Sequence, residues 1–257
     1  MNVLNDFLSS FEFRLVATEA ERQRAYALRH AVFRRELDYQ MTEDADLRLE
    51  SDLYDQKSLM VMLEHKRSGL SAGCMRMVPA LGIGPAHLQR LPLEEHCTDS
   101  LTHPQLHPQK LPREKVCEIS RLAVPAYFRH RSQKQHLIDV ADATHPSFSP
   151  DEARTFPLIG ISLFLAATAL VGLTGHYHVF AMMESRLPRL LAIQGLRFQR
   201  VGELTVFHGK RHAFYIDQRQ AVIDMQPTLA ALYRHVEETL TRQYHQKVLS
   251  LDSVTFS

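Results

Sequence analysis

The stretch KVCEISRLAV, Lys115 to Val124, places two charged residues, Glu118 and Arg121, inside an otherwise apolar strand. An uncharged helical stretch follows at Pro157 to Gly175, and then a second apolar strand, YHVFAMM, at Tyr177 to Met183. A strand, a long helix and a further strand in this order are typical of α/β proteins, in which helices cover a sheet. The sequence therefore predicts an α/β fold.

Further helices and strands flank this unit. Thr18 is predicted to begin a helix as its N-cap, because Glu21 three residues later completes a capping box. Ser185 is predicted to cap a short helix that runs through Ile193 and is ended by Gly195, and a C-terminal helix is predicted from about Pro227 to Leu249. The remaining strands are predicted at Phe11–Val16, Ser58–Glu64, Ala72–Pro79, Phe198–Glu203 and Ala213–Asp217.

The whole chain is predicted to form one domain. Residues 42–55 and 80–114 have little periodicity and are typical of irregular surface segments, but no low-complexity linker divides the chain. We expect a central mixed twisted sheet, partly antiparallel at its N-terminal side, with helices on both faces. The domain spans residues 1–257, with a core at 11–217 and a C-terminal helical extension at 218–257.

Composition argues against several classes of function. The formal net charge of +1 gives no electrostatic reason to bind nucleic acid. The fifteen histidines include no pair at metal-ligand spacing, so no metal site is predicted. The three cysteines, Cys74, Cys97 and Cys117, are odd in number and far apart, as in proteins of a reducing compartment. With no secretory signal pattern at the N-terminus, we expect a cytoplasmic protein.

The uncharged stretch from Pro157 to Gly175 reaches the lower length limit of a membrane span. Gly160, Thr168 and Gly172 dilute its apolar character, and no basic clusters or aromatic belts flank it. A buried core helix is therefore favoured, with at most peripheral membrane contact.

Charged residues inside apolar segments are the most informative feature for function. A buried charge is unfavourable unless it is paired, so several such residues together indicate a mutual network. Each one taken singly is compatible with an ordinary salt bridge, but together they favour a functional cleft. The three arginines and three carboxylates are Arg29, Arg76, Arg121, Asp52, Asp55 and Glu118.

The spacing within the strand at Lys115–Val124 predicts a local irregularity. Strict alternation puts Ser120 on the same face as Glu118, but it puts Arg121 on the opposite face. A β-bulge adds one residue and reverses the alternation, and bulges are common beside active sites. We therefore predict a bulge between Glu118 and Ala123, which brings Glu118 and Arg121 into one site.

These residues carry a resemblance to two related families. The chain resembles the acyl-homoserine-lactone synthases in the pattern Arg29-x-x-Val32-Phe33, Tyr39, Asp52-x-x-Asp55, Gly73-x-x-Arg76 and Glu118-x-Ser120-Arg121. It also resembles the acyltransferases associated with PEP-CTERM/exosortase systems, which are relatives of the long-chain N-acyl amino acid synthases. The matching segments are LPLEEHC (Leu91–Cys97), EISRLAV and AMMESRLPRLLAIQGLRFQRVG (Ala181–Gly202), and the resemblance extends from about residue 12 to 217.

The resemblance implies an acetyltransferase-type (GNAT-like) fold in which two central parallel strands splay apart to admit a thioester. The implied function is transfer of a long-chain fatty acyl group to the amine of an amino acid or similar small molecule. No permanently bound cofactor is implied, since the acyl-phosphopantetheine thioester is a substrate. The implied catalytic residues are Glu118, as base, with Arg121 and Ser120. The implied substrate-binding residues are Arg29, Phe33, Tyr39, Asp52, Asp55 and Arg76.

The donor is predicted to be an acyl carrier protein rather than coenzyme A. Coenzyme-A-dependent relatives have a glycine-containing loop after the splayed strand, whereas this chain has FRHRSQK at Phe128–Lys134. Arg129, Arg131 and Lys134 are the implied contacts to the phosphopantetheine phosphate and the acidic carrier, although a solvated charge run remains an alternative.

Two other functions stay open. An acyl-homoserine-lactone synthase is disfavoured by Tyr39, because those enzymes usually have tryptophan there. A non-catalytic acyl-carrier-binding module is the third possibility.

Overall fold

The computed structural model has a twisted central sheet, and it describes residues 3–81, 89–129 and 147–254. The strands lie in the spatial order β1–β4–β5–β6–β7–β10–β8, and β9 pairs with β10 alone. A separate two-stranded sheet joins β2 and β3. The bounds are β1 Phe11–Leu15, β2 Glu43–Asp44, β3 Leu49–Glu50, β4 Leu59–His65, β5 Leu70–Pro79, β6 Val116–Ala123, β7 His178–Met183, β8 Gln199–Arg200, β9 Thr205–Val206 and β10 Lys210–Asp217.

The strands β6 and β7 form the parallel pair of the sheet, and they separate part-way along. Their register runs through Val116 opposite His178 to Glu118 opposite Phe180 and stops there. Both strands continue, β6 to Ala123 and β7 to Met183, without pairing to each other. The other pairs of the main sheet are antiparallel. The predicted mixed sheet with splayed parallel strands is therefore confirmed.

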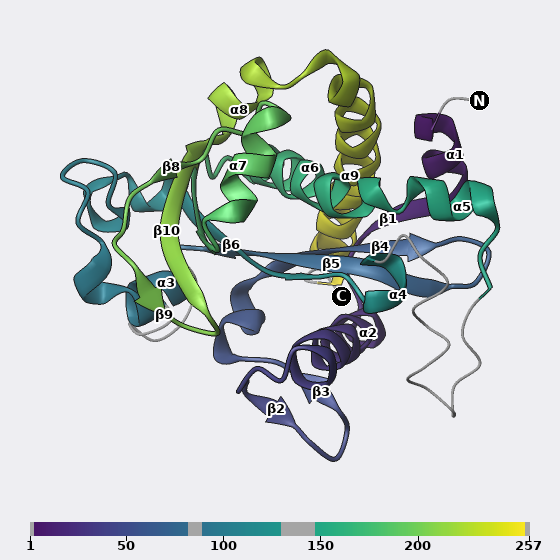
Figure 1. The fold of residues 1–257 in the computed structure, drawn as a ribbon, viewed down its shortest axis with the longest axis horizontal. Coiled ribbons are helices and arrows are strands. Elements are labelled where there is room, and N and C mark those ends of the chain that lie inside the picture. Colours follow the sequence, from purple (N-terminus) through teal and green to yellow (C-terminus); the bar gives the residue numbers. More distant parts are fainter. Residues whose placement is uncertain (1–2, 82–88, 130–146, 255–257) are drawn as a thin grey trace.

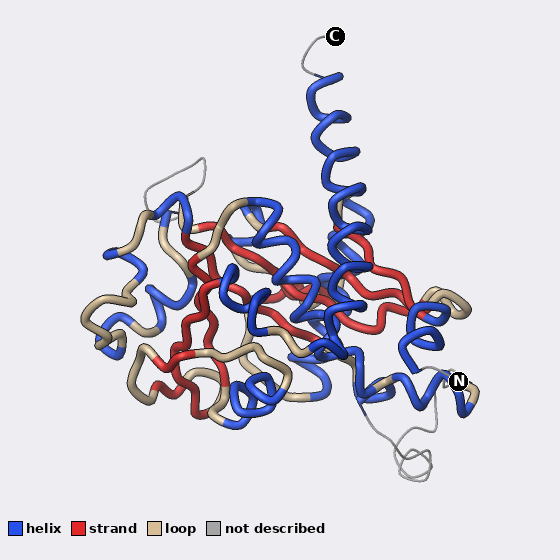
Figure 2. The backbone as a smooth tube through the Cα atoms, turned by 90° about the horizontal axis from the view of Figure 1, so that it is seen from above, coloured by secondary structure: helices blue, strands red, loops and turns tan. Residues whose placement is uncertain are grey.

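Helices cover both faces of the sheet (Figure 1), with α6, α7 and α9 on one side and α2 on the other. Figure 2 shows the same molecule from above, with α9 extending beyond the sheet toward the C-terminus. The α-helices are α1 Val3–Ser10, α2 Glu19–His30, α3 Pro92–His96, α4 Ala126–Arg129, α5 Pro150–Thr155, α6 Pro157–Thr174, α7 Arg186–Ile193, α8 Gln218–Asp224 and α9 Pro227–Val254. Short π- or 3₁₀-helical turns are η1 Ala31–Glu36, η2 Leu53–Lys57, η4 Thr98–Ser100, η5 Pro108–Lys110 and η6 Arg113–Lys115.

The uncharged helix α6 packs in the core. Among the described residues it is the one helix long and apolar enough to span a membrane, by length and composition. Its side chains Ile159, Leu163 and Leu165 are fully buried, and the helix contacts β4, β5 and α9. It ends at Gly175, whose φ of 71° is a left-handed conformation that suits glycine. The predicted buried core helix is therefore confirmed.

The helix α2 approaches the opposite face of the sheet. Thr18 caps it as predicted, and the side chain of Glu21 accepts a hydrogen bond from the Thr18 N–H in return. Leu28 and Val32 are buried against the sheet with Cys74 of β5. The apolar stripe of this helix therefore holds its last turn, which carries Arg29, against the central strands.

Several elements differ from the sequence-based expectation. The predicted loop at 42–55 contains the β2–β3 hairpin and η2, and α3 interrupts the irregular segment 80–114. Ser185 lies at the N-terminus of α7, but its side chain makes no capping hydrogen bond because its backbone is already helical. The C-terminal segment is helical, as expected, and Val236 of α9 is buried in the same core cluster as α6.

A glycine in β5 permits the close approach of α6. A Cβ atom on Gly73 would lie 2.6 Å from Cδ1 of Leu163 and 3.0 Å from the carbonyl oxygen of Ala123. An added methyl group at this point must therefore displace the buried side chain of Leu163, and it also crowds the backbone of β6 at Ala123.

We predict that Gly73→Ala lowers the free energy of unfolding by about 1–3 kcal/mol, the usual effect of overpacking a core. Urea unfolding followed by circular dichroism measures the change. Gly160→Ala is the matched control, because a Cβ there meets nothing within 4 Å and alanine favours a helix. Equal stability of the two variants would contradict the close-packing argument.

Candidate active site

A β-bulge in β6 sets the geometry of the site. Arg76 of β5 lies opposite Ser120, whereas Cys74, two residues earlier, lies opposite Ala123. The strand β6 thus has one extra residue, and Arg121 within it has a φ of 57°. Because the bulge reverses the alternation, Arg121 faces the same side of the sheet as Ser120. The predicted bulge between Glu118 and Ala123 is confirmed.

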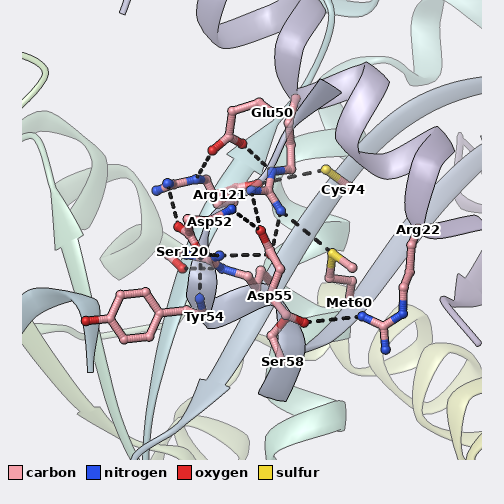
Figure 3. A network of polar contacts seen from close by, with 12 residues as sticks. Arg22, Glu50, Asp52, Tyr54, Asp55, Ser58, Met60, Cys74, Ser120 and Arg121 are labelled. Atoms are coloured by element: carbon pink, nitrogen blue, oxygen red, sulfur yellow. Dashed lines mark hydrogen bonds and ion pairs between the residues drawn. The ribbon is translucent and has the colours of Figure 1, made fainter. Parts of the chain in front are cut away.

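Three arginines and three carboxylates form a closed circuit of ion pairs, here called the charge ring (Figure 3). Each arginine contacts two of the carboxylates, and each carboxylate contacts two of the arginines. The contacts are Arg29 to Glu50 and, with two hydrogen bonds of 2.7 and 2.9 Å, to Asp55; Arg76 to Asp55 at 2.9 Å and Asp52 at 2.6 Å; and Arg121 to Asp52 at 2.8 Å and Glu50 at 3.1 Å.

Local structure holds each member of the charge ring in place. Asp52 is the N-cap of η2, where its side chain accepts the Tyr54 N–H, and Asp55 accepts the Asp52 N–H at 2.8 Å. Glu50 ends β3, and Arg29 lies in the last turn of α2. The ring therefore joins α2, the β3–η2 segment, β5 and β6, which are far apart in the sequence.

Burial and mutual attraction determine the ionisation of the ring. Burial disfavours the charged form of Asp55, but Arg76 and Arg29 outweigh it and hold the pKa of this carboxyl well below its usual range. Burial acts on Asp52 in the same way, and Arg76 and Arg121 lower its pKa. The three positive and three negative charges cancel.

A cavity of about 370 Å³ passes through the gap between β6 and β7. Its lining comes from both faces of the sheet, as expected where two strands separate. On the α2 and α3 side the lining residues are mostly polar or aromatic: Phe33, Tyr39, His96, Glu118, Ser120, Arg121, Phe207, His208 and Arg211. On the α6 and α7 side they are mostly apolar, namely Met75, Ile119, Phe164, Ala181, Met183, Leu187 and Leu190, with Glu184 and Arg186 where β7 leads into α7. The cavity therefore has a polar end and an apolar end.

Glu118 lies at the polar end and outside the charge ring. Its side chain is 2% exposed, and its Oε2 accepts a hydrogen bond from the Leu93 N–H at 2.7 Å. Burial raises the pKa of Glu118 to about 7, against the opposing effects of that hydrogen bond and of Arg76 and Arg121. Burial thus outweighs the arginines, a balance that the sequence left open.

Ser120 connects the charge ring to the cavity. Its hydroxyl accepts a hydrogen bond from Nε of Arg76 at 3.2 Å, and the residue also lines the cavity. The Nη2 of Arg76 is buried without a hydrogen-bond partner among the described residues. Arg76 therefore has one N–H group, Nη2, that is still able to donate a hydrogen bond near Ser120.

The aromatic residues predicted from the sequence lie together at the polar end. Tyr39 stacks between Phe33, at a ring separation of 6.3 Å, and His208 at 5.1 Å. The guanidinium of Arg211 lies 5.9 Å from the centre of the Tyr39 ring. His208 and Arg211, which the sequence analysis did not select, belong to the β9–β10 turn and the start of β10.

The structure also revises the membership of the charged cluster. Glu118 was grouped with the three arginines, but the third ring carboxylate is Glu50. The sequence does not single out Glu50, because its acidic segment is typical of a surface loop. Its sequence signal was a single carboxylate two residues before Asp52.

The predicted carrier contacts are only partly described. Arg129 is on α4, where it forms an ion pair with Glu36, and Glu36 also accepts the Ala126 N–H. Arg131 and Lys134 lie outside the described residues. For metals, no group of three or more histidine, cysteine, aspartate or glutamate side chains in the described part of the chain could hold an ion.

Residues 28–139 match the model of the acetyltransferase (GNAT) domain. None of the curated proteins matches the sequence. Solved structures do: TofI, in a ternary complex with an inhibitor and MTA, is 20% identical, with a TM-score of 0.53 over 87% of this chain and 96% of TofI. FeeM, an N-acyl amino acid synthase from uncultured soil microbes, is 12% identical, with a TM-score of 0.56 over 85% and 96%.

BjaI, a CoA-dependent acyl-homoserine lactone synthase with SAM and isopentyl-CoA, is 16% identical, with a TM-score of 0.53 over 88% of this chain and 89% of BjaI. At these identities the likeness establishes the fold, which is the predicted GNAT-like acyltransferase fold. The domain match and the shared fold together support an acyltransferase enzyme.

We predict that Arg29→Met destabilises the protein by about 3–5 kcal/mol, because Glu50 and Asp55 each lose one of two buried partners. Urea unfolding at neutral pH measures the loss. Arg24→Met is the control: its ion pair with Glu64 is at the surface, and such pairs contribute about 0–1 kcal/mol. A similar small loss in both variants would show that the ring does not hold the fold.

Proposed function

We propose that this chain is an N-acyltransferase that moves a long-chain fatty acyl group from a carrier thioester to the amine of an amino acid or similar small molecule. The observation that supports this proposal most directly is the cavity through the sheet. It has Glu118 at its polar end and a mostly apolar lining at the other end. A fatty thioester and a polar amine need such an arrangement, because they must meet at one carbonyl carbon.

The gap between β6 and β7 supports a place for the donor. Beyond Glu118 and Phe180 the two strands no longer pair, so backbone groups that face the gap past this point are not bonded from one strand to the other. Backbone N–H groups in such positions can bind the amides of a pantetheine arm and polarise a thioester carbonyl. One well-placed donor of this kind contributes about 3–4 kcal/mol to transition-state stabilisation.

Glu118 is the proposed general base. A pKa of about 7 leaves a large share of this carboxyl ionised at neutral pH, which suits proton transfer. An acceptor that arrives as an ammonium ion gives one proton to Glu118 and becomes nucleophilic. The nitrogen attacks the thioester carbon, the C–N bond forms and the C–S bond breaks. The second proton lost by nitrogen neutralises the leaving thiolate.

The apolar end of the cavity supports a fatty acyl chain. Phe164 of α6, Leu187 of α7 and Met183 of β7 surround it. Methionine side chains are unbranched and can adjust to a chain of variable shape. Phe164 and Ile119 also border a second, smaller apolar cavity.

The donor we propose is an acyl carrier protein, on the basis of the glycine-free segment Phe128–Lys134. Coenzyme A is the rival, since BjaI is a CoA-dependent synthase of the same fold. The association with exosortase systems rests on the sequence resemblance. Arg29, Asp52, Asp55 and Arg76 are proposed to act by holding the site rather than by touching the acceptor, because they are committed to the charge ring.

Product analysis tests this function. The protein is incubated with long-chain acyl carrier protein or the matching acyl-CoA, together with a mixture of amino acids and SAM, and products are identified by mass spectrometry. We expect N-acyl amino acids, formed faster from the carrier. Acyl-homoserine lactone would instead identify a lactone synthase. Firm carrier binding with no product would identify a non-catalytic carrier-binding module.

We predict that Glu118→Gln lowers kcat by about 10²-fold or more, because glutamine cannot accept the proton. In the wild type, turnover should rise with pH through about 7 as Glu118 ionises, and the variant should lose this dependence. Initial rates between about pH 5 and about pH 9 measure both effects, since this range extends roughly two units on each side of that pKa.

Stability separates this loss from misfolding. A raised pKa means that Glu118 supports the fold at low pH and loses that contribution as pH rises through about 7. Glu118→Gln should therefore be at least as stable as the wild type above pH 7. Turnover close to the wild-type value in this stable variant would exclude Glu118 as the base.

A further inference from the structure

Arg211 occupies an unusual position at the polar end of the cavity. It is the second residue of β10, directly after the turn in which His208 and Gly209 have φ of 49° and 99°. The next residue, His212, pairs with Met183 at the end of β7. Arg211 therefore directly precedes the part of β10 that pairs with β7, the strand on one side of the gap. It lines the same cavity as Glu118.

The guanidinium of Arg211 is held in place but not neutralised. Its Nε donates to the carbonyl oxygen of His208 at 3.2 Å, and its plane lies near the ring of Tyr39. No carboxylate among the described residues forms an ion pair with it. The ring residue Arg121, by contrast, contacts both Glu50 and Asp52. Arg211 thus brings positive charge into the cavity wall with its terminal nitrogens uncommitted.

The histidines His96 and His208, which line the same cavity, do not compensate this charge. A second arginine of the lining, Arg186, lies at the start of α7. Burial lowers the pKa of His96 and of His208, so both are neutral at pH 7. A half-buried arginine close to an aromatic ring is suited to a planar anion, because its fork of N–H donors matches a carboxylate. The polar end of the cavity therefore contains a site for a carboxylate beside a proposed base.

We propose that Arg211 binds the carboxylate of the acceptor, so that this enzyme takes α-amino acids in preference to amines that lack a carboxylate. The inference rests on the proposed function and deepens it. With the carboxylate on Arg211, the amine of the same molecule is left to face Glu118 and the thioester in the gap. Arg211 is then a specificity-determining residue and not the base.

The test compares matched acceptors that differ only in the carboxylate: phenylalanine with phenethylamine, and leucine with 3-methylbutylamine. Arg211→Gln should raise the KM for the amino acids about 10- to 100-fold, the usual effect of losing a hydrogen bond to a charged group, and leave the KM for the amines unchanged. Arg211→Lys should be intermediate, because it keeps the charge and loses the fork.

Lys210→Gln is the matched control. It removes the same charge from the adjacent residue, whose side chain is exposed, and should leave all KM values unchanged. An equal effect of Arg211→Gln on amines and amino acids would overturn the proposal. A rise in the KM for the acyl donor alone would do so as well, because it would assign Arg211 to the phosphate of that substrate.

Calorimetric titration with the same four compounds keeps this inference separate from the proposed function. The wild type should bind each amino acid at least tenfold more tightly than its amine, and Arg211→Gln should lose that preference. If the preference is present and no acyl product forms, the carboxylate site stands and the acyltransferase proposal fails. If products form without any preference, the carboxylate site is wrong and the acyltransferase proposal stands.

Discussion

The closed circuit of Arg29, Arg76 and Arg121 with their three carboxylates is the constraint on which the rest of the site depends. Each charge is buried or nearly so, and an unpaired charge in such a place is strongly unfavourable. Every member has two partners of opposite charge. If one member moves away, each of those two partners loses one of its ion pairs. The circuit thereby fixes the ends of four segments, α2, β3–η2, β5 and β6, in one arrangement.

The bulge in β6 connects the charge ring to the cavity, because it places Arg121 in both. Arg121 can join the ring only because the extra residue turns it to the α2 side of the sheet. The same strand carries Glu118 three residues earlier, just where β6 leaves β7. The ring thus holds the C-terminal part of β6 in place through Arg121, while the middle of β6 separates from β7 after Glu118. Glu118, excluded from the ring, keeps a raised pKa that a ring carboxylate could not have.

Much of the fold could be predicted from alternation and periodicity. The central strands, the capped helix α2 and the core helix α6 follow from apolar patterns that extend over many residues. The bulge was predictable because Glu118 and Arg121 have an odd spacing on one strand.

The pairing of charges was not predictable, because it depends on which segments meet in space. Glu50 lies in a short hairpin whose sequence is typical of a solvated loop, and only the fold brings it against Arg29. His208 and Arg211 had no apolar pattern to single them out, since their role comes from a turn beside the end of β7.

The composition of the ring also bears on how such a protein can diverge over evolutionary time. Replacing any one of the six residues leaves two buried partners of opposite charge incompletely paired, and lysine cannot replace an arginine that contacts two carboxylates in a fork. The cavity residues outside the ring, such as Phe164 and Leu187, face no such joint requirement, since each contributes shape alone. Single substitutions of these residues can therefore change the shape of the cavity while the ring stays intact.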